Sequence, residues 1–279
     1  MDYQILAARF RAKKYTHSNH SAATQTPLNR LESDCAIAEP ELFWYQAIQL
    51  ESDKLGYSMK PLIATSLILF SSLSVAQTLN IAQFSQENLD SWETKSFVGE
   101  TQYSITQLDD QTVLHAQTDQ SASGLAKEIK VDLQKTPFLN WTWRIENRLP
   151  KMDETSKAGD DYAARLYIVK SGGFFIWQTK ALNYVWSSNQ ATGSVWDNAY
   201  AGSNARMLAL RSPQDPLSTW VTEKRNVYAD MIALYGDKGS DKANEEAYRY
   251  IDAVAIMSDT DDSKAKASAY YGNIYFTAQ

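Results

Sequence analysis

The chain has 279 residues and a mass of 31.5 kDa, with 44% hydrophobic and 22% charged residues. This is the composition of a globular protein, and it excludes wholly disordered, collagen-like and coiled-coil chains. The formal net charge of −6 argues against nucleic-acid binding, because neutralising phosphates requires a clustered surface of Lys and Arg. Nucleic acid is therefore not an expected partner.

An internal segment, residues 59–76, has the pattern of an export signal. Met59 and Lys60 form a short positive start, an apolar run follows over 62–73, and Ser74 and Ala76 are the small residues that a signal peptidase requires. The run is shorter than the roughly 20 residues of a membrane span. We predict cleavage after Ala76 and a periplasmic or secreted mature protein without a transmembrane anchor. A buried core segment is the alternative, but it does not explain the start and end of the pattern.

Residues 1–58 show no sustained helical or strand period, and they contain the only cysteine, Cys35. We predict that translation begins at Met59 and that residues 1–58 are a non-native or disordered upstream extension. A cytoplasmic arm that precedes an anchor is the alternative. The predicted mature chain, residues 77–279, lacks cysteine, which excludes thiol nucleophiles and cysteine metal sites within it. Its length suffices for one domain whose core needs no disulfides.

The mature chain has a dominant hydrophobic period of two, as in Trp141, Trp143 and Ile145, which is typical of β-strands. In chain order, the pattern predicts strands over 80–84, 92–97, 103–108, 112–117, 124–131, 138–146, 162–169, 174–185, 207–211, 220–227, 253–257 and 270–277. Short helical turns are expected over 226–235 and 244–248. Many short strands without intervening amphipathic helices predict an all-β domain, a two-layer antiparallel β-sandwich with one or two short helices.

An acidic pair enters the strand predicted over 162–169. Asp160 and Asp161 precede this strand, and Arg165 lies on it. A guanidinium holds a carboxylate or phosphate through two parallel hydrogen bonds, so these three residues are candidates for binding a polar ligand. An ion pair buried inside the sandwich is an equally weighted alternative.

A second group of candidate ligand-binding residues combines polar and aromatic side chains. Glu223, Arg225 and Asn226 supply acceptors and donors for sugar hydroxyls, and an exposed ion-paired strand is the alternative. An aromatic-rich stretch adds Asn183, Tyr184 and Trp186. Rings stack on sugar faces and an amide bonds hydroxyls, but we expect most of the aromatic side chains to be core.

Three carboxylates, those of Asp259, Asp261 and Asp262, fall within four residues after an apolar strand. Calcium prefers oxygen ligands, so these three residues are candidate calcium ligands, although a solvated acidic turn is the more frequent outcome for so short a motif. The sequence contains no GxGxxG, GxxxxGK[ST], HExxH or GxSxG pattern. Nucleotide, zinc-protease and nucleophile-elbow chemistry therefore have no support.

Four segments taken together carry a family resemblance: residues 159–169, 181–186, 220–236, and 255–262 leading to 269–276. Their order and spacing resemble the exported bacterial family of domain of unknown function 3047, over nearly all of residues 77–279. The resemblance implies an all-β domain similar to the galactose-binding-like jelly rolls of many carbohydrate-binding modules. It implies no activity, because fold alone does not carry function.

The sequence thus predicts an exported sandwich that binds a carbohydrate, such as a polysaccharide, or another polar ligand of the cell envelope without transforming it. One alternative is a glycoside hydrolase or polysaccharide lyase in which Glu223 faces Asp160 or Asp161. A carboxyl separation of about 5 to 9.5 Å across an open groove would support hydrolysis, whereas carboxylates held by Arg support binding or a structural role. The other alternative is a structural envelope protein without a small ligand, whose polar cluster is wholly buried and satisfied and has no pocket beside it.

Overall fold

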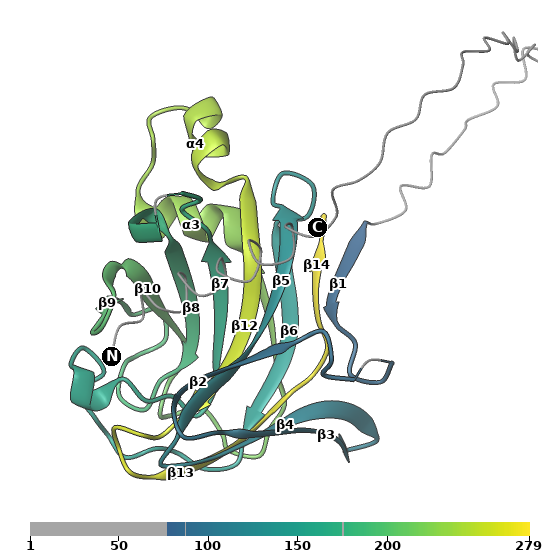
Figure 1. Cartoon of the computed structure of the whole chain (residues 1–279), viewed down its shortest axis with the longest axis vertical. Coiled ribbons are helices and arrows are strands. Elements are labelled where there is room, and N and C mark those ends of the chain that lie inside the picture. Colours follow the sequence, from purple (N-terminus) through teal and green to yellow (C-terminus); the bar gives the residue numbers. More distant parts are fainter. Residues whose placement is uncertain (1–76, 87, 175) are drawn as a thin grey trace, which may run out of the picture. The chain divides into compact units, whose positions relative to one another are not determined.

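The computed structural model describes residues 77–279, except residues 87 and 175. The predicted extension over 1–58 and the predicted signal over 59–76 lie outside the described residues. The described part consists of two seven-stranded sheets with two α-helices, so the predicted all-β sandwich is confirmed (Figure 1). Neither α-helix in this part is long and apolar enough to cross a membrane.

The first sheet, sheet A, is centred on β6. Its order is β1-β14-β6-β13-β4-β3, and β11 also pairs with β6. The strands are β1 (Thr78–Ala82), β3 (Gln102–Leu108), β4 (Gln111–Asp119), β6 (Phe138–Ile145), β11 (Val221–Asn226), β13 (Lys266–Tyr271) and β14 (Ile274–Thr277). All pairings in sheet A are antiparallel.

The second sheet, sheet B, has the order β2-β5-β12-β7-β8-β10-β9. Its strands are β2 (Glu93–Val98), β5 (Ala122–Asp132), β7 (Arg165–Lys170), β8 (Lys180–Trp186), β9 (Val195–Asn198), β10 (Gly202–Arg211) and β12 (Tyr250–Asp259). The pairing of β8 with β10 is parallel, which differs from the predicted wholly antiparallel arrangement. A parallel neighbour requires a crossover, and the segment containing β9 provides it.

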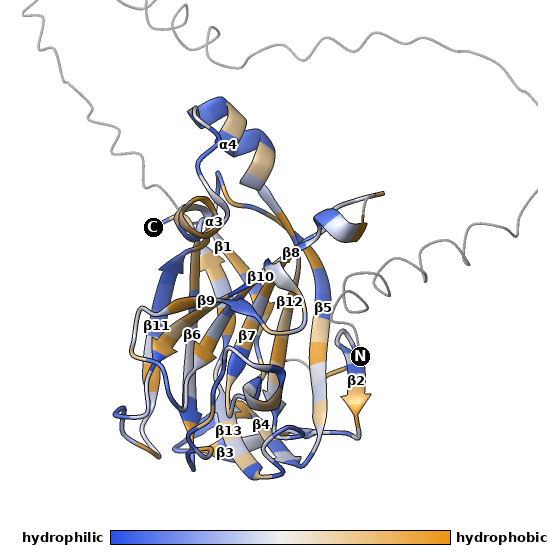
Figure 2. Cartoon of the chain, turned by 90° about the vertical axis from the view of Figure 1, so that its left-hand side faces the viewer, coloured by the Kyte–Doolittle hydropathy of each residue, from blue (hydrophilic) through white to orange (hydrophobic). Residues whose placement is uncertain are grey.

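The core lies between the two sheets and follows from the period of two. On β6, Leu139, Trp141, Trp143 and Ile145 are buried, while the residues between them are half-buried. The Trp141 ring stacks on Tyr184 of β8 with centroids 5.4 Å apart. These aromatic side chains join the sheets, and Figure 2 shows hydrophobic and hydrophilic residues alternating along the strands.

Sheet B also buries side chains on the face turned away from sheet A, which we call the outer face. Tyr167, Val169, Ala253, Ala255 and Met257 form a cluster there, separate from the main core. Burial on both faces explains why β12 is a nearly continuous apolar run and not an alternating one. The outer face also carries Arg165 and Asn183, because each is directly opposite an outer-face residue in the strand register.

The two predicted helices are confirmed as α3 (Val227–Tyr235) and α4 (Asp241–Tyr248). Their starts have local causes. The Asn226 side chain accepts a hydrogen bond from the Ala229 amide, and the Ser240 hydroxyl accepts one from the Ala243 amide. The helix α3 ends at Gly236, whose φ of 89° is accessible to glycine at little cost.

Two predicted strands differ from the structure, and one strand and part of another were not predicted. The strand predicted over 174–185 is a loop with a short 3-10 helix, η3 (Ile176–Gln178), followed by β8. The strand predicted over 270–277 is divided into β13 and β14 at Gly272, where the Thr142 side chain occupies the space of a Cβ. The strand β9 and the first half of β10 were not predicted, because residues 195–206 show no sustained alternation of apolar and polar residues.

Candidate functional site

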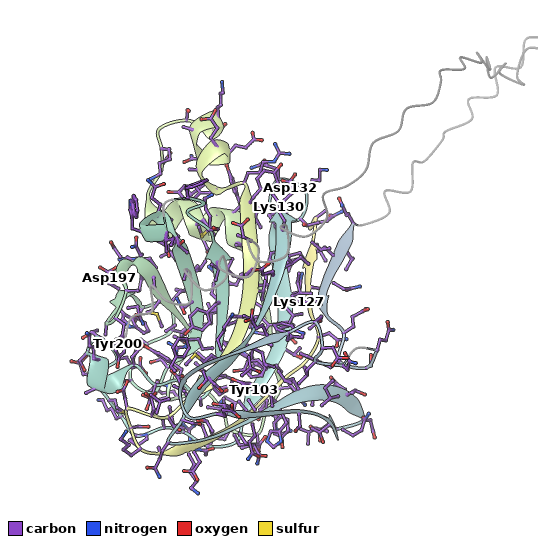
Figure 3. All side chains as sticks on the ribbon, in the orientation of Figure 1. Tyr103, Lys127, Lys130, Asp132, Asp197 and Tyr200 are labelled. Carbon is purple, nitrogen blue, oxygen red and sulfur yellow. The ribbon has the colours of Figure 1, made fainter. Side chains whose placement is uncertain are left out.

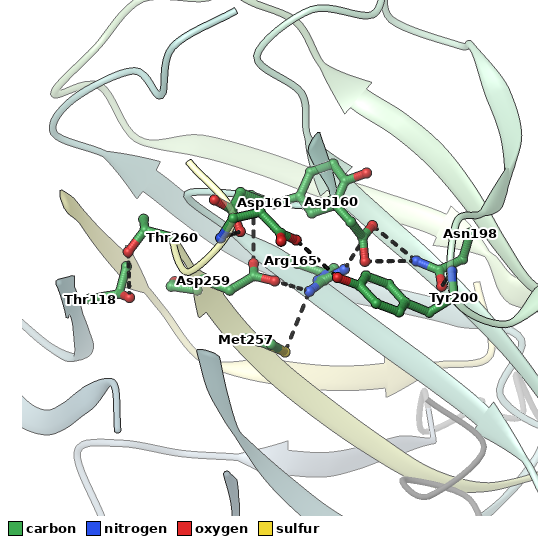
Figure 4. Close-up of polar contacts among 12 residues, drawn as sticks. Thr118, Asp160, Asp161, Arg165, Asn198, Tyr200, Met257, Asp259 and Thr260 are labelled. Atoms are coloured by element: carbon green, nitrogen blue, oxygen red, sulfur yellow. Dashed lines mark hydrogen bonds and ion pairs between the residues drawn. The ribbon is translucent and has the colours of Figure 1, made fainter. Parts of the chain in front are cut away.

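The predicted acidic pair belongs to a larger group at one end of sheet B, which we call the aspartate–arginine cluster. Its members come from the loop after the 3-10 helix η2 (Lys157–Gly159), the start of β7, the region of β9, and the end of β12 with the turn that follows. They are Asp160, Asp161, Arg165, Asn198, Tyr200, Asp259, Asp261 and Asp262. Figure 4 labels all of them except Asp261 and Asp262.

Arg165 lies at the centre of the cluster and is fully buried. Its Nη2 forms an ion pair with Asp259, and its Nη1 lies 3.6 Å from Asp160 Oδ1. The guanidinium carbon lies 4.7 Å from the ring centroid of Tyr162 and 4.9 Å from that of Tyr167. Two aromatic faces and two carboxylates thus surround the cation, which compensates for its loss of hydration.

Asp160 and Asp161 are both 1% exposed and have different partners. Asn198 Nδ2 donates to both oxygens of Asp160, at 2.9 and 3.0 Å. The backbone amides of Asp262 and Ser263 donate to Asp161 at 3.2 and 2.5 Å. The chain reaches this position through Gly159, where a Cβ would overlap the backbone of the preceding turn. Glycine is therefore required just before the pair.

Asp259 completes the buried part of the cluster. Its Oδ1 accepts a hydrogen bond from the Tyr162 amide at 3.1 Å, while its Oδ2 faces Arg165. Burial raises the pKa of Asp259 well above its usual range, and the charges of Asp161 and Asp160 act in the same direction against the effect of Arg165. One cation thus serves three buried carboxylates, and the cluster carries an excess of negative charge.

The outer rim of the cluster is half-buried. Carboxylate oxygens of Asp161, Asp261 and Asp262 lie within 4.8 Å of one another, and Tyr200 Oη lies 3.3 Å from Asp262 Oδ2. Figure 3 shows Tyr200 on the side of the domain opposite Lys127 and Lys130. Oxygen donors of this kind suit calcium. The structure groups Asp261 and Asp262 with Asp161, whereas Asp259 faces Arg165; the calcium site stays a prediction.

The rim makes stability depend on pH. Burial, followed by the charge of Asp262, raises the pKa of Asp261 to about 6. Because unfolded Asp has a pKa of about 3.9, the folded state binds this proton more tightly, and the contribution of Asp261 to the free energy of unfolding falls as pH rises from about 4 to about 6.

Asp261→Asn is therefore expected to stabilise the protein at pH 7, by about 1 kcal/mol after allowance for solvent screening. At pH 4 the difference between variant and wild type should vanish. Urea unfolding at both pH values with EDTA present measures it. Equal stability of the two proteins at pH 7 would show that neither burial nor the neighbouring carboxylates disfavour the charged form of Asp261.

The predicted residues of β8 divide between two environments. Tyr184 and Trp186 are 0% and 3% exposed in the core between the sheets. Asn183 is buried on the outer face, where its Nδ2 donates to the carbonyl oxygens of Ala181 at 2.9 Å and Arg206 at 3.4 Å. Its Oδ1 has no hydrogen-bond partner among the described residues.

The remaining predicted residues form networks away from the cluster. Glu223 Oε1 accepts hydrogen bonds from Arg211 Nε at 2.6 Å and Trp143 Nε1 at 3.0 Å. Arg225 forms an ion pair with Asp230, which also accepts a bond from the Tyr184 hydroxyl. Asn226 serves as the cap of α3. The structure thus gives Glu223, Arg225 and Asn226 partners of their own and does not bring them to Arg165.

Sequence reasoning missed three members of the site and its surroundings. Asn198 and Tyr200 lie at the unpredicted strand β9 and in the turn after it, where no local pattern identifies them. Tyr162 falls within the strand predicted over 162–169 but precedes β7. Its ring stacks on Arg165, and its buried hydroxyl has no hydrogen-bond partner among the described residues. The signal that could have found Tyr162 is its position directly after the acidic pair.

Comparisons with known proteins give one family and several distant structures. A family 11 carbohydrate-binding module from Clostridium thermocellum, in complex with a β-1,3-1,4-mixed-linked tetrasaccharide, is similar at 13% identity and a TM-score of 0.40, covering 71% of this chain and 94% of that chain. The xyloglucanase domain of a type three effector from Sinorhizobium fredii is similar at 11% identity and a TM-score of 0.39, covering 67% and 92%. A cellulase derived from Cel12A of Rhodothermus marinus is similar at 10% identity and a TM-score of 0.37, covering 71% of this chain and 100% of that chain.

No curated protein matches the chain in sequence. The family of unknown function DUF3047 matches residues 90–275, as the sequence motifs predicted, and the chain belongs to it.

Proposed function

We propose that the chain is a periplasmic or secreted protein that binds a carbohydrate or another polar ligand of the cell envelope, without transforming it, at the aspartate–arginine cluster. One observation supports binding without catalysis: the buried carboxylates already have hydrogen-bond or ion-pair partners within the protein. Asn198 holds Asp160, two backbone amides hold Asp161, and Arg165 holds Asp259. A glycosidase instead needs one carboxyl group that donates its proton and a second that acts as base or nucleophile.

The hydrolase alternative has less support for a second reason. It requires Glu223 to face Asp160 or Asp161 across a groove. Glu223 lies on sheet A, where its Oε1 is bonded to Arg211 and Trp143. Asp160 and Asp161 precede β7 of sheet B and take their hydrogen bonds from other residues.

Two unsatisfied polar atoms support ligand binding over a purely structural role. The Tyr162 hydroxyl and Asn183 Oδ1 are buried, and neither has a hydrogen-bond partner among the described residues. Such an atom costs about 1 to 3 kcal/mol, so buried polar groups are usually paired. Both residues lie close to the surroundings of Arg165: the Tyr162 ring stacks on its guanidinium, and Asn183 is opposite Tyr167, whose ring stacks on the same guanidinium. A hydroxyl-rich ligand supplies both the donor and the acceptor that these atoms lack.

The unsatisfied hydroxyl provides a test that separates binding from stability. The purified protein is heated with cellohexaose, an N-acetylglucosamine hexamer or a muropeptide, each with and without calcium chloride. A probe at 100 times its dissociation constant should add about 2.7 kcal/mol, which raises Tm by roughly 5 to 10 °C. Tyr162→Phe should leave the stability of the free protein equal or higher, because it removes an unpaired hydroxyl, and it should abolish most of the shift.

Tyr248→Phe is the matched control. The Tyr248 hydroxyl donates to the carbonyl oxygens of Tyr235 and Gly236, so its loss should lower the stability of the free protein and leave the ligand-induced shift intact. A shift of wild-type size in Tyr162→Phe, or no shift with any of the three probes, would contradict the proposal.

A further inference from the structure

The loop between β7 and β8, described over residues 171–174 and 176–179, exposes three large apolar side chains. Phe174 is 78% exposed, Trp177 is 62% exposed and Ile176 is 36% exposed. The other large apolar residues exposed to this degree in the described part are Val98 on β2 and Val195 on β9. Figure 2 shows the loop projecting beyond the end of β8. Exposed apolar side chains gathered on one projecting loop mark an interaction surface.

Hydrogen bonds to the rest of the domain and within the loop fix the loop backbone. Asn204 Nδ2 donates to the Trp177 carbonyl oxygen at 3.1 Å, and the Thr179 hydroxyl accepts a bond from the Gly172 amide at 3.1 Å. Asp252 on β12 accepts a bond from the Ser171 amide at 2.8 Å. The hydrogen bonds therefore position the backbone, while the apolar side chains are presented to solvent.

Lysines flank these apolar side chains. Lys170 at the end of β7 and Lys180 at the start of β8 are directly opposite in the strand register. Like charges in that position repel, so the pair costs stability. Burial lowers the pKa of Lys180, and the charges of Lys238 and Lys170 lower it further. Asp252 and Asp237, which directly precedes Lys238, offset part of this charge. The local positive charge stands against a net charge of −6 for the whole chain.

We infer that this loop docks on an anionic lipid bilayer. Phe174, Ile176 and Trp177 enter the interfacial region, where aromatic rings are favoured, and Lys170, Lys180 and Lys238 face the headgroup phosphates. Charge complementarity argues for this occupant. The aspartate–arginine cluster begins at Arg165, at the other end of β7, about 17 Å from Lys170 at 3.3 Å per residue. A docked protein therefore turns its lysines to the negative surface and its surplus carboxylates away from it.

Vesicle co-sedimentation tests the inference. The purified protein is mixed with vesicles of phosphatidylcholine or of equal parts phosphatidylcholine and phosphatidylglycerol. Mass spectrometry identifies the N-terminal residue of each variant, so that residues 59–76, if retained, are common to all of them. The wild type should bind the mixed vesicles more tightly. Phe174→Ser/Trp177→Ser should weaken binding to both kinds of vesicle. Lys180→Gln/Lys238→Gln should weaken binding to the anionic vesicles alone, by roughly 10-fold or more.

Val98→Ser/Val195→Ser is the matched control, since it removes two exposed apolar side chains elsewhere, and it should bind as the wild type does. Wild-type binding by the Phe174→Ser/Trp177→Ser variant would overturn the inference. A second result would also overturn it: the protein binds soluble polygalacturonate tightly, this binding requires Trp177, and the polygalacturonate displaces the vesicles. The loop would then be a site for an anionic glycan. Thermal unfolding confirms that each variant is folded, and neither outcome depends on the probes that test the proposed function.

Discussion

Replacing Arg165 by Met is expected to destabilise the protein by about 3 to 5 kcal/mol, the cost of leaving buried carboxylates without their cation. Arg165 is fully buried, and its guanidinium contacts Asp259 and Asp160. Methionine retains the volume between the rings of Tyr162 and Tyr167 and removes the charge. Urea unfolding at pH 7 measures the loss.

Two companion variants make this result specific. Arg165→Met/Asp259→Asn should be more stable than Arg165→Met, because one of the unpaired carboxylates is then neutral. Arg249→Met removes an arginine whose side chain is 34% exposed and paired with Asp132, so it should cost far less. If Arg165→Met unfolds at the urea concentration of the wild type, the ion pairs of the cluster do not hold this end of sheet B.

Trp141→Ala is expected to cost about 3 to 5 kcal/mol as well, through a cavity between the two sheets. Trp141 is 1% exposed, stacks on Tyr184 of sheet B, and meets Trp143 edge to face with centroids 5.5 Å apart. Chemical unfolding measures the change. Trp220→Ala, directly before β11, where the residue is half-buried, should cost less than about 1 kcal/mol.

The Trp141 result also bears on the aromatic residues predicted to bind sugar. Tyr184 and Trp186 lie opposite Trp141 and Trp143 in the same core, with Trp143 and Trp186 centroids 5.8 Å apart. If Trp141→Ala lowered stability by less than about 1 kcal/mol, the contact between the sheets would not depend on this aromatic group, and the assignment of Tyr184 and Trp186 to the core would lose its energetic support.

Much of the fold was predictable because its causes are local. The alternation of Trp141, Trp143 and Ile145 predicted β6, and a strand buried on one face needs only that period. The helix α3 was predictable from the residues at its ends, since Asn226 caps its start and Gly236 ends it. The strand β9 and the parallel pairing of β8 with β10 were not predictable, because residues 195–206 show no sustained alternation and the choice of neighbouring strand depends on distant residues.

The sequence by itself indicated that Asp160, Asp161 and Arg165 lie close together, because all three fall within six residues at one strand end. Only the tertiary structure decided their partners. Asp259 lies 94 residues from Arg165 and reaches it because β12 pairs with β7. Alternation likewise states that a side chain is on one face of a strand, but not whether that face meets solvent or a second layer. That depends on how the sheets pack, which is why Trp186 is buried in the core and Trp177, nine residues before it, is exposed on a loop.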